Sequence, residues 1–171
     1  VDILTIYKKA RRKHLDDKHK YVEEHYKSVE RQKNFFEACI KQILNDVGIS
    51  EDAYDKAWER LIYKEPNVIS AMDQKRSQVL TSILKEREGE PSTENYIKGM
   101  ELMTEKYHEA NFSGVVDSPQ LASSLRLLYL EDLAHAAYGV ELSNIHVERI
   151  QSDTRIFSAM LRFANVIRSN S

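Results

Sequence analysis

Turn-forming residues are scarce in this sequence, which contains five glycines and three prolines among 171 residues. A β-sandwich or β-barrel needs turn residues at intervals of roughly 8 to 12 positions, and this chain does not supply them. Apolar residues make up 42% of the chain, enough to close a hydrophobic core. The composition therefore predicts an all-α protein, and the length is that of a single domain.

The sequence also contains no pair of cysteines, no long apolar run and no basic segment followed by an apolar stretch of roughly 7 to 15 residues, so nothing in it indicates secretion. The single cysteine, Cys39, has no partner for an intramolecular disulfide. The longest strictly apolar run, Leu127 to Leu130, is far shorter than the roughly 20 residues of a membrane helix. These absences predict a soluble intracellular protein without membrane insertion, cytoplasmic in the first instance and nuclear as the alternative.

Capping residues divide the chain into expected helices. Ser50 and Ser118 are suited to begin helices, and Gly48 is suited to end one in the left-handed conformation. Asp153 is a possible internal cap that would divide the last segment in two. The expected helices span about residues 2–14, 16–47, 50–61, 66–89, 92–111, 118–139 and 143–167. We predict a single-domain bundle of six or seven helices, with residues 1–34 as a charged arm that can protrude and 35–171 as the packed bundle.

The long N-terminal helix carries a heptad pattern of apolar residues, in which steps of three and four alternate. Its polar first half contributes Val22, Tyr26 and Val29, and its apolar second half is rich in large side chains. We predict that these three residues are at least partly exposed and bind a protein partner. The pattern does not identify this partner, which is either another protein or a second copy of the same chain.

A basic run precedes this helix. It consists of Lys8, Lys9, Arg11, Arg12 and Lys13, with no acidic residue among them. A solvated helix face is one interpretation, because acidic residues are interleaved further along. Phosphate contacts are the second, which would make the chain an RNA-binding or ribonucleoprotein-associated module. Binding to a membrane surface is the third, although few bulky apolar residues lie nearby.

Motifs that carry chemistry are missing from the sequence: it has no glycine-rich phosphate loop, no GxSxG, no paired CxxC and no HExxH. A di-iron helical bundle needs two Glu-x-x-His motifs, and only Glu105 to His108 fits. Glu131 and His135 lie one helical turn apart, in an apolar context that suits a half-buried structural histidine. We therefore expect no catalytic residues, no metal and no cofactor, and a buried Cys39.

The C-terminal segment 156–167 is apolar at nine of its twelve positions, too many for one stripe of a surface helix. We predict that Phe157 and Leu161 belong to the core and that Met160 and Phe163 bind a partner, with at least one of them bordering a groove. Together these patterns predict a non-catalytic protein–protein interaction or adaptor module of an intracellular complex.

Overall fold

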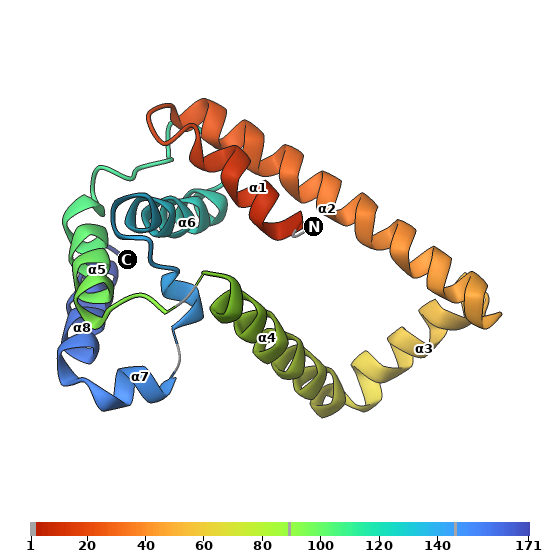
Figure 1. Cartoon of the computed structure of the whole chain (residues 1–171). Helices are drawn as coiled ribbons and strands as arrows, with labels where there is room; N and C mark the ends of the chain where they lie inside the picture. The colour runs from red at the N-terminus through yellow and green to blue at the C-terminus, as the bar shows by residue number, and fades with distance from the viewer. Residues whose placement is uncertain (1–2, 89, 146) are drawn as a thin grey trace. The chain divides into compact units, whose positions relative to one another are not determined.

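A computed structural model describes residues 3–88, 90–145 and 147–171. Every regular element in these residues is helical, with eight α-helices and one short 3-10 turn and no strand (Figure 1). The predicted all-α class is thus confirmed, whereas the expected count of six or seven helices is not. The α-helices are α1 (Ile3–Arg12), α2 (Lys18–Val47), α3 (Glu51–Lys64), α4 (Pro66–Glu88), α5 (Thr93–Lys106), α6 (Pro119–Tyr138), α7 (Val147–Ser152) and α8 (Thr154–Ser169), and the 3-10 turn η1 is Leu142–Asn144.

Helix ends follow the local signals of the sequence. Gly48 and Gly139 have φ angles of 72° and 68°, the left-handed values that close a helix and that strain any residue with a Cβ. The Ser50 hydroxyl accepts a hydrogen bond from Ala53 N at 3.2 Å and so caps α3. Asp153 accepts one from Arg155 N at 2.9 Å, and this cap separates α8 from α7.

The chain divides into two compact units, so the predicted single-domain bundle is not confirmed. Unit 1 comprises residues 1–28 and 91–171, and unit 2 comprises residues 29–90. Helix α2 contributes its first part to unit 1 and the remainder to unit 2. The first 28 residues therefore belong to the same unit as residues 91–171.

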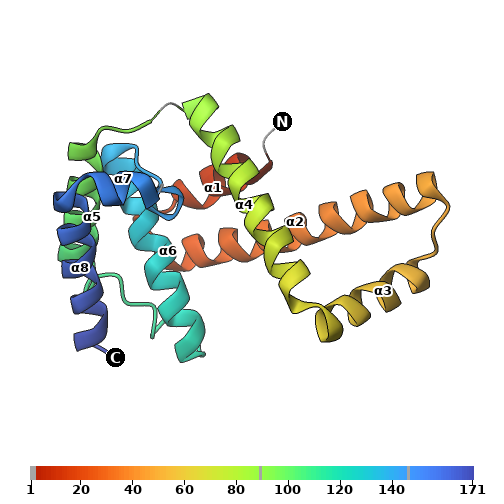
Figure 2. The ribbon, with the colours of Figure 1, turned by 90° about the horizontal axis from the view of Figure 1, so that it is seen from below.

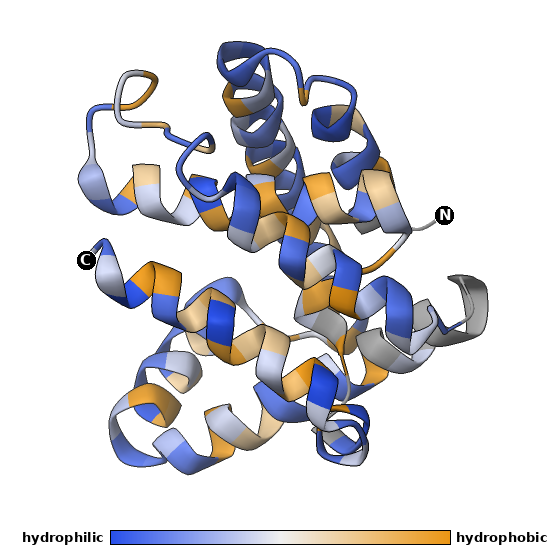
Figure 3. Ribbon diagram, turned by 90° about the vertical axis from the view of Figure 1, so that its left-hand side faces the viewer, coloured by the Kyte–Doolittle hydropathy of each residue, from blue (hydrophilic) through white to orange (hydrophobic). Residues whose placement is uncertain are grey.

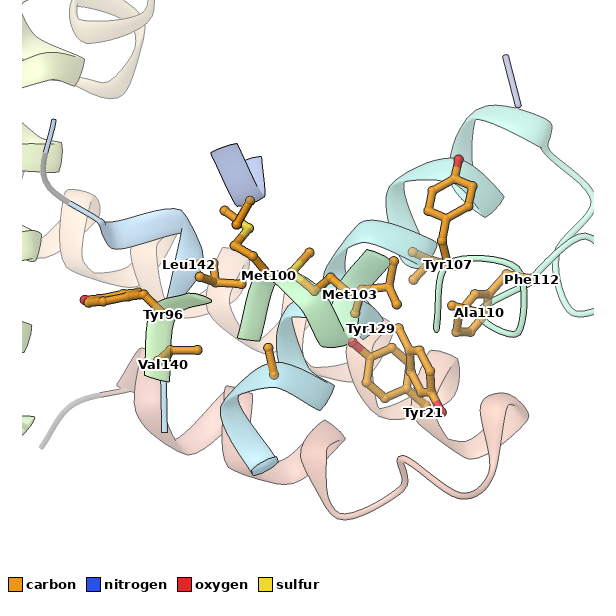
Figure 4. Close-up of a cluster of buried hydrophobic side chains, with 14 of the residues drawn as sticks. Tyr21, Tyr96, Met100, Met103, Tyr107, Ala110, Phe112, Tyr129, Val140 and Leu142 are labelled. Carbon is orange, nitrogen blue, oxygen red and sulfur yellow. The ribbon is translucent and has the colours of Figure 1, made fainter. Parts of the chain in front are cut away.

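Unit 1 is built around α5, which packs against α6 and α8. Gly99 on α5 permits close approach of the segment after α6, because a Cβ at this position would lie 2.6 Å from Val140 Cγ2. Figure 4 shows Met100 and Met103 of α5 in the middle of this core, with Tyr96 and Val140 toward one end. The core of unit 1 is thus a contact of helix surfaces, in which Gly99 lets the chain after α6 lie close to α5.

Three aromatic side chains hold the start of α2 in unit 1. Tyr21 is fully buried, and its ring centroid lies 5.2 Å from that of Tyr129 and 6.0 Å from that of Phe112. The Tyr129 hydroxyl donates a hydrogen bond to the carbonyl oxygen of Leu15 at 2.5 Å, in the turn between α1 and α2. These contacts fix the N-terminal helices to α6 and to the loop before it.

Unit 2 comprises α2 from Val29 onward, α3 and α4. Figures 1 and 2 both show α3 and α4 meeting at an angle at the turn before Pro66. Among the described side chains of this unit, Leu44 alone is buried. The side chains that the structure describes in unit 2 therefore form no developed core, in contrast to those of unit 1.

Candidate interaction surfaces

A buried carboxylate on α6 binds the basic run of α1. Asp132 is fully buried, and its oxygens accept hydrogen bonds from Arg11 Nε at 2.7 Å and Arg12 Nε at 2.8 Å. The Tyr21 hydroxyl donates a third at 2.6 Å, and a second guanidinium nitrogen of Arg11 donates a fourth at 3.2 Å. Asp132 thus joins α1, α2 and α6 at one point inside unit 1.

A second carboxylate, Glu141, extends this cluster after the end of α6. It forms ion pairs with Arg12 Nη2 at 2.7 Å and Lys8 Nζ at 3.3 Å. His135 Nε2 lies 3.7 Å from the same carboxylate. We call Lys8, Arg11, Arg12, Tyr21, Asp132 and Glu141 the Asp132 cluster.

Protonation equilibria in the cluster favour the ionised carboxylates. Burial of Asp132 on its own raises its pKa, but the hydrogen bonds and positive charge of Arg11 outweigh it, so the pKa lies below the usual value. The pKa of Glu141 is lowered in the same way, because the charges of Arg12 and Lys8 outweigh burial. The arginines and the carboxylates of the cluster are therefore all ionised, and their opposite charges compensate one another.

Two neighbours of the cluster have pKa values shifted against ionisation. Burial raises the pKa of Glu131, and the negative charges of Glu141 and Asp132 raise it further. Burial lowers the pKa of His25, and the positive charge of Arg11 lowers it further. The cluster thus influences groups beyond its own ion pairs.

The basic run is in large part an internal structural element. Arg11 and Arg12 both form ion pairs with the buried carboxylate of Asp132, and Lys8 pairs with Glu141. Lys9 and Lys13 are exposed. The RNA interpretation assigns phosphate contacts to all five cations, but such contacts by Lys8, Arg11 and Arg12 would break these ion pairs. Only Lys9 and Lys13 of the basic run can therefore contact phosphates without breaking an ion pair of the cluster.

Sequence analysis missed Asp132, although a signal was present. Glu131 and Asp132 interrupt the apolar run of α6, and adjacent acidic residues in such a helix place at least one near the apolar face. A buried acid requires a cationic partner, and the arginines of α1 were the available ones. The two signals lie about 120 residues apart, so neither identifies the other.

The predicted partner-binding residues of α2 are not equivalent. Val22 is only 7% exposed and belongs to the core of unit 1, so the prediction that it is exposed is wrong. It is buried because α2 is fixed at Tyr21, one residue earlier. Tyr26 and Val29 are 41% and 48% exposed, as the sequence pattern predicts.

Large apolar side chains are exposed on all three helices of unit 2. Tyr63 on α3 is 85% exposed, and Ile43 on α2 is 59% exposed. We call the full set the unit 2 apolar surface: Val29, Phe35, Phe36, Ile43, Val47, Ile49, Ile62, Tyr63, Val68, Met72 and Val79. So many exposed apolar residues around a single buried leucine are typical of a protein interaction surface.

A shallow groove lies between α2 and α3 within unit 2. Ile40 and Leu44 line it from α2, and Tyr54 and Asp55 from α3. Helix α3 therefore covers the side of α2 that carries Leu44. The neighbouring positions Phe36, Ile43 and Val47 stay exposed.

Helix α8 buries other apolar residues than the sequence pattern predicts. Phe157 and Leu161 are 51% and 48% exposed, so their predicted core positions are wrong, and Ile156 and Ala159 are buried instead. Met160 and Phe163 are half-buried and pack against the core of unit 1. In Figure 3, α8, which ends at the C-terminus, carries orange apolar positions along its length.

The groove beside α8 does not involve the two predicted partner-binding residues. Arg155, Ser158 and Arg162 line it from α8, together with Glu94 and Glu101 of α5. Arg155 pairs with Glu94 at 2.7 Å, so the groove is spanned by ion pairs. Partner binding by Met160 and Phe163 therefore stays a prediction.

The described residues contain no group of three or more His, Cys, Asp or Glu side chains placed to hold a metal ion. Cys39 is half-exposed and not buried as expected. His135 is half-buried beside Glu141, as its apolar context predicts.

None of the helices in the described part of the chain is both long and apolar enough to cross a membrane. In comparisons with known proteins, no family model, no curated protein and no solved structure matches this chain.

Proposed function

We propose that the chain is a non-catalytic protein–protein interaction module, an adaptor of an intracellular complex. In this proposal unit 1 is the stably folded part, and unit 2 presents the binding surface. The observation that carries it is the unit 2 apolar surface, where three helices expose large side chains and bury only Leu44 among the described residues.

Burial energetics support this division of roles. Burying apolar surface contributes about 25 cal/mol per Å² to the stability of a protein or complex. The exposed side chains of unit 2 therefore leave several kcal/mol of possible stabilisation unused. A partner that covers the unit 2 apolar surface would supply this stabilisation on binding. Tyr63 is the most exposed of these residues, and Tyr is among the residue types that contribute most to binding energy at interfaces.

Site-specific photo-crosslinking in cells tests the proposal. Tyr63 is replaced by the photo-reactive p-benzoyl-phenylalanine, which keeps an aromatic ring at this exposed position. Phe157, an exposed aromatic residue of unit 1, receives the same replacement as the matched control. We expect a discrete adduct of higher mass at position 63 and not at 157, and mass spectrometry then identifies the attached protein.

An absence of adducts at position 63 and at a second position, Met72, would contradict the proposal. Equal and diffuse adducts at positions 63 and 157 would do so as well, because random collision does not distinguish the units. The RNA-binding alternative stays a prediction. Its remaining basis in the basic run is the exposure of Lys9 and Lys13.

A further inference from the structure

The second part of α2 presents an apolar stripe at heptad spacing that its own unit leaves exposed. Phe36, Ile43 and Val47 are 41%, 59% and 60% exposed. With Tyr26, Val29, Lys33 and Ile40 they form a series in which steps of three and four alternate, and we call this series the α2 seam. Such a series is typical of the contact line of a coiled coil.

Helix α3 faces the side of α2 that carries Ile40 and Leu44, and it leaves Phe36, Ile43 and Val47 exposed. Successive residues of an α-helix are separated by about 100°, so Leu44 and Ile43 point in different directions. Leu44 is buried in the groove facing α3, whereas Ile43 remains exposed. The Arg76 guanidinium of α4 lies 5.6 Å from the ring centroid of Phe36, which keeps its exposure of 41%.

The area of the α2 seam fits a second copy of the same helix. Five large side chains that are each about half exposed offer on the order of 500 Å² per copy. Two copies would bury about 1,000 Å², just below the ~1,200 Å² at which stable protein interfaces begin. The seam therefore predicts a dimer that forms at micromolar concentration and dissociates on dilution.

Charges beside the seam distinguish a parallel from an antiparallel pair. In heptad notation Glu30 and Glu37 occupy e positions, and His25 and Gln32 occupy g positions. A parallel pair brings g positions opposite e positions of the other copy, so each glutamate meets a neutral side chain, His25 or Gln32. An antiparallel pair brings e positions opposite e positions, which places the glutamates of the two copies together.

Lys33 occupies an a position within the seam. A single lysine at such a position costs stability but specifies register. Its Nζ lies 3.9 Å from Glu37 Oε1 on the same helix, and this contact reduces the repulsion between the two lysines of a dimer.

From these observations we infer that a second copy of this chain occupies the α2 seam, forming a parallel, in-register, two-stranded coiled coil. The inference rests on the proposed function and specifies its partner. Phe36 and Ile43 form its main apolar layers, and Val47 lies at its C-terminal end.

Disulfide crosslinking of the full chain tests the inference. Cys39 is first replaced by Ser, and Ile43→Cys is then introduced at a d position, where the two copies of a parallel dimer face each other. Disulfides need Cα atoms roughly 4.4–6.8 Å apart, which an in-register pair provides at this position. Ala38→Cys, on the opposite face of α2 and also exposed, is the matched control.

We expect the Ile43→Cys chain to form at least ten times more crosslinked dimer than the Ala38→Cys chain under mild oxidation. Light scattering of the unmodified chain should show its mass doubling as concentration rises to ~100 μM, where a dimer with a micromolar Kd is mostly formed. Val47→Cys, at an a position, gives a second crosslinking site if Ile43→Cys does not fold.

Each other result overturns the inference in an identifiable way. A monomer at every concentration excludes the second copy, and equal crosslinking at positions 38 and 43 shows random collision. A dimer without crosslinks at positions 43 and 47 uses another surface or an antiparallel arrangement. A monomeric chain that still yields an adduct to a different protein from Tyr63 leaves the proposed function standing, whereas a monomer without that adduct contradicts both.

Discussion

Replacing Asp132 with Asn is the sharpest test of how unit 1 holds its N-terminal helices. The substitution keeps the shape of the side chain but removes the charge that compensates Arg11 and Arg12. Both arginines then lie beside a neutral amide, and Arg11 is buried. Breaking a buried ion pair by removing one partner costs about 3–5 kcal/mol, a large part of the ~5–15 kcal/mol stability of a typical domain.

Spectroscopy can follow the two units separately in this experiment. Trp58 is the only tryptophan and lies in unit 2, so its fluorescence reports that unit. The near-UV circular dichroism of buried tyrosines such as Tyr21 and Tyr129 reports unit 1. We expect Asp132→Asn to lower the melting temperature of the near-UV signal by on the order of 10 °C.

An exposed ion pair supplies the matched control. Glu101 lies 3.5 Å from Arg162, with both side chains more than half exposed. Glu101→Gln also removes one negative charge, but it should change stability by less than ~1 kcal/mol because water screens the pair. If Asp132→Asn costs no more than Glu101→Gln, the Asp132 cluster does not hold α1 in place and the reasoning is refuted.

Three further perturbations have defined outcomes. Glu131→Gln should raise the melting temperature at pH 7 but not near pH 4, because a raised pKa means that ionisation at higher pH opposes folding; calorimetry at both pH values checks this. Gly99→Ala should cost about 1–3 kcal/mol in urea unfolding through overlap with Val140. If RNA binds through Lys9 and Lys13 alone, a plot of log binding constant against log salt concentration should fall with a slope no steeper than ~1.4, which corresponds to two phosphate contacts. Filter binding measures this slope, and a steeper one would mean that the other cations also contact phosphates and are not held in ion pairs.

Local signals predicted most of the helix boundaries. Gly48 ends α2 and Ser50 begins α3, because left-handed closure and side-chain capping depend on a few neighbouring residues. Asp153 likewise separates α7 from α8. Such signals act within one helical turn, so a single sequence is sufficient to recognise them.

Long-range contacts explain why the division into units could not be predicted. Tyr21 lies in a charged stretch that is typical of an exposed helix, yet it is fully buried. Its partners, Phe112, Tyr129 and Asp132, lie about 90 to 110 residues further along the chain. Nothing within α2 identifies them, and the same limitation hid the pairing of Asp132 with Arg11.

The orientation of α8 was mispredicted because its apolar residues surround most of the helix. When nine of twelve residues in a segment are apolar, the pattern does not indicate which side faces the core. A rotation by one residue, about 100°, exchanges Phe157 for Ile156 as the buried side chain. The cap at Asp153 and the packing of α5 against α8 decide this rotation.

The heptad pattern of α2 predicted an apolar stripe correctly but not what covers it. The stripe passes from Val22 to Val47 without a change in spacing, while its surroundings change near Ser28, where unit 1 gives way to unit 2. In unit 1 the chain itself buries the stripe at Val22. In unit 2 the described side chains leave Ile43 and Val47 exposed, so the same apolar spacing is covered by the chain at one end of α2 and remains uncovered at the other.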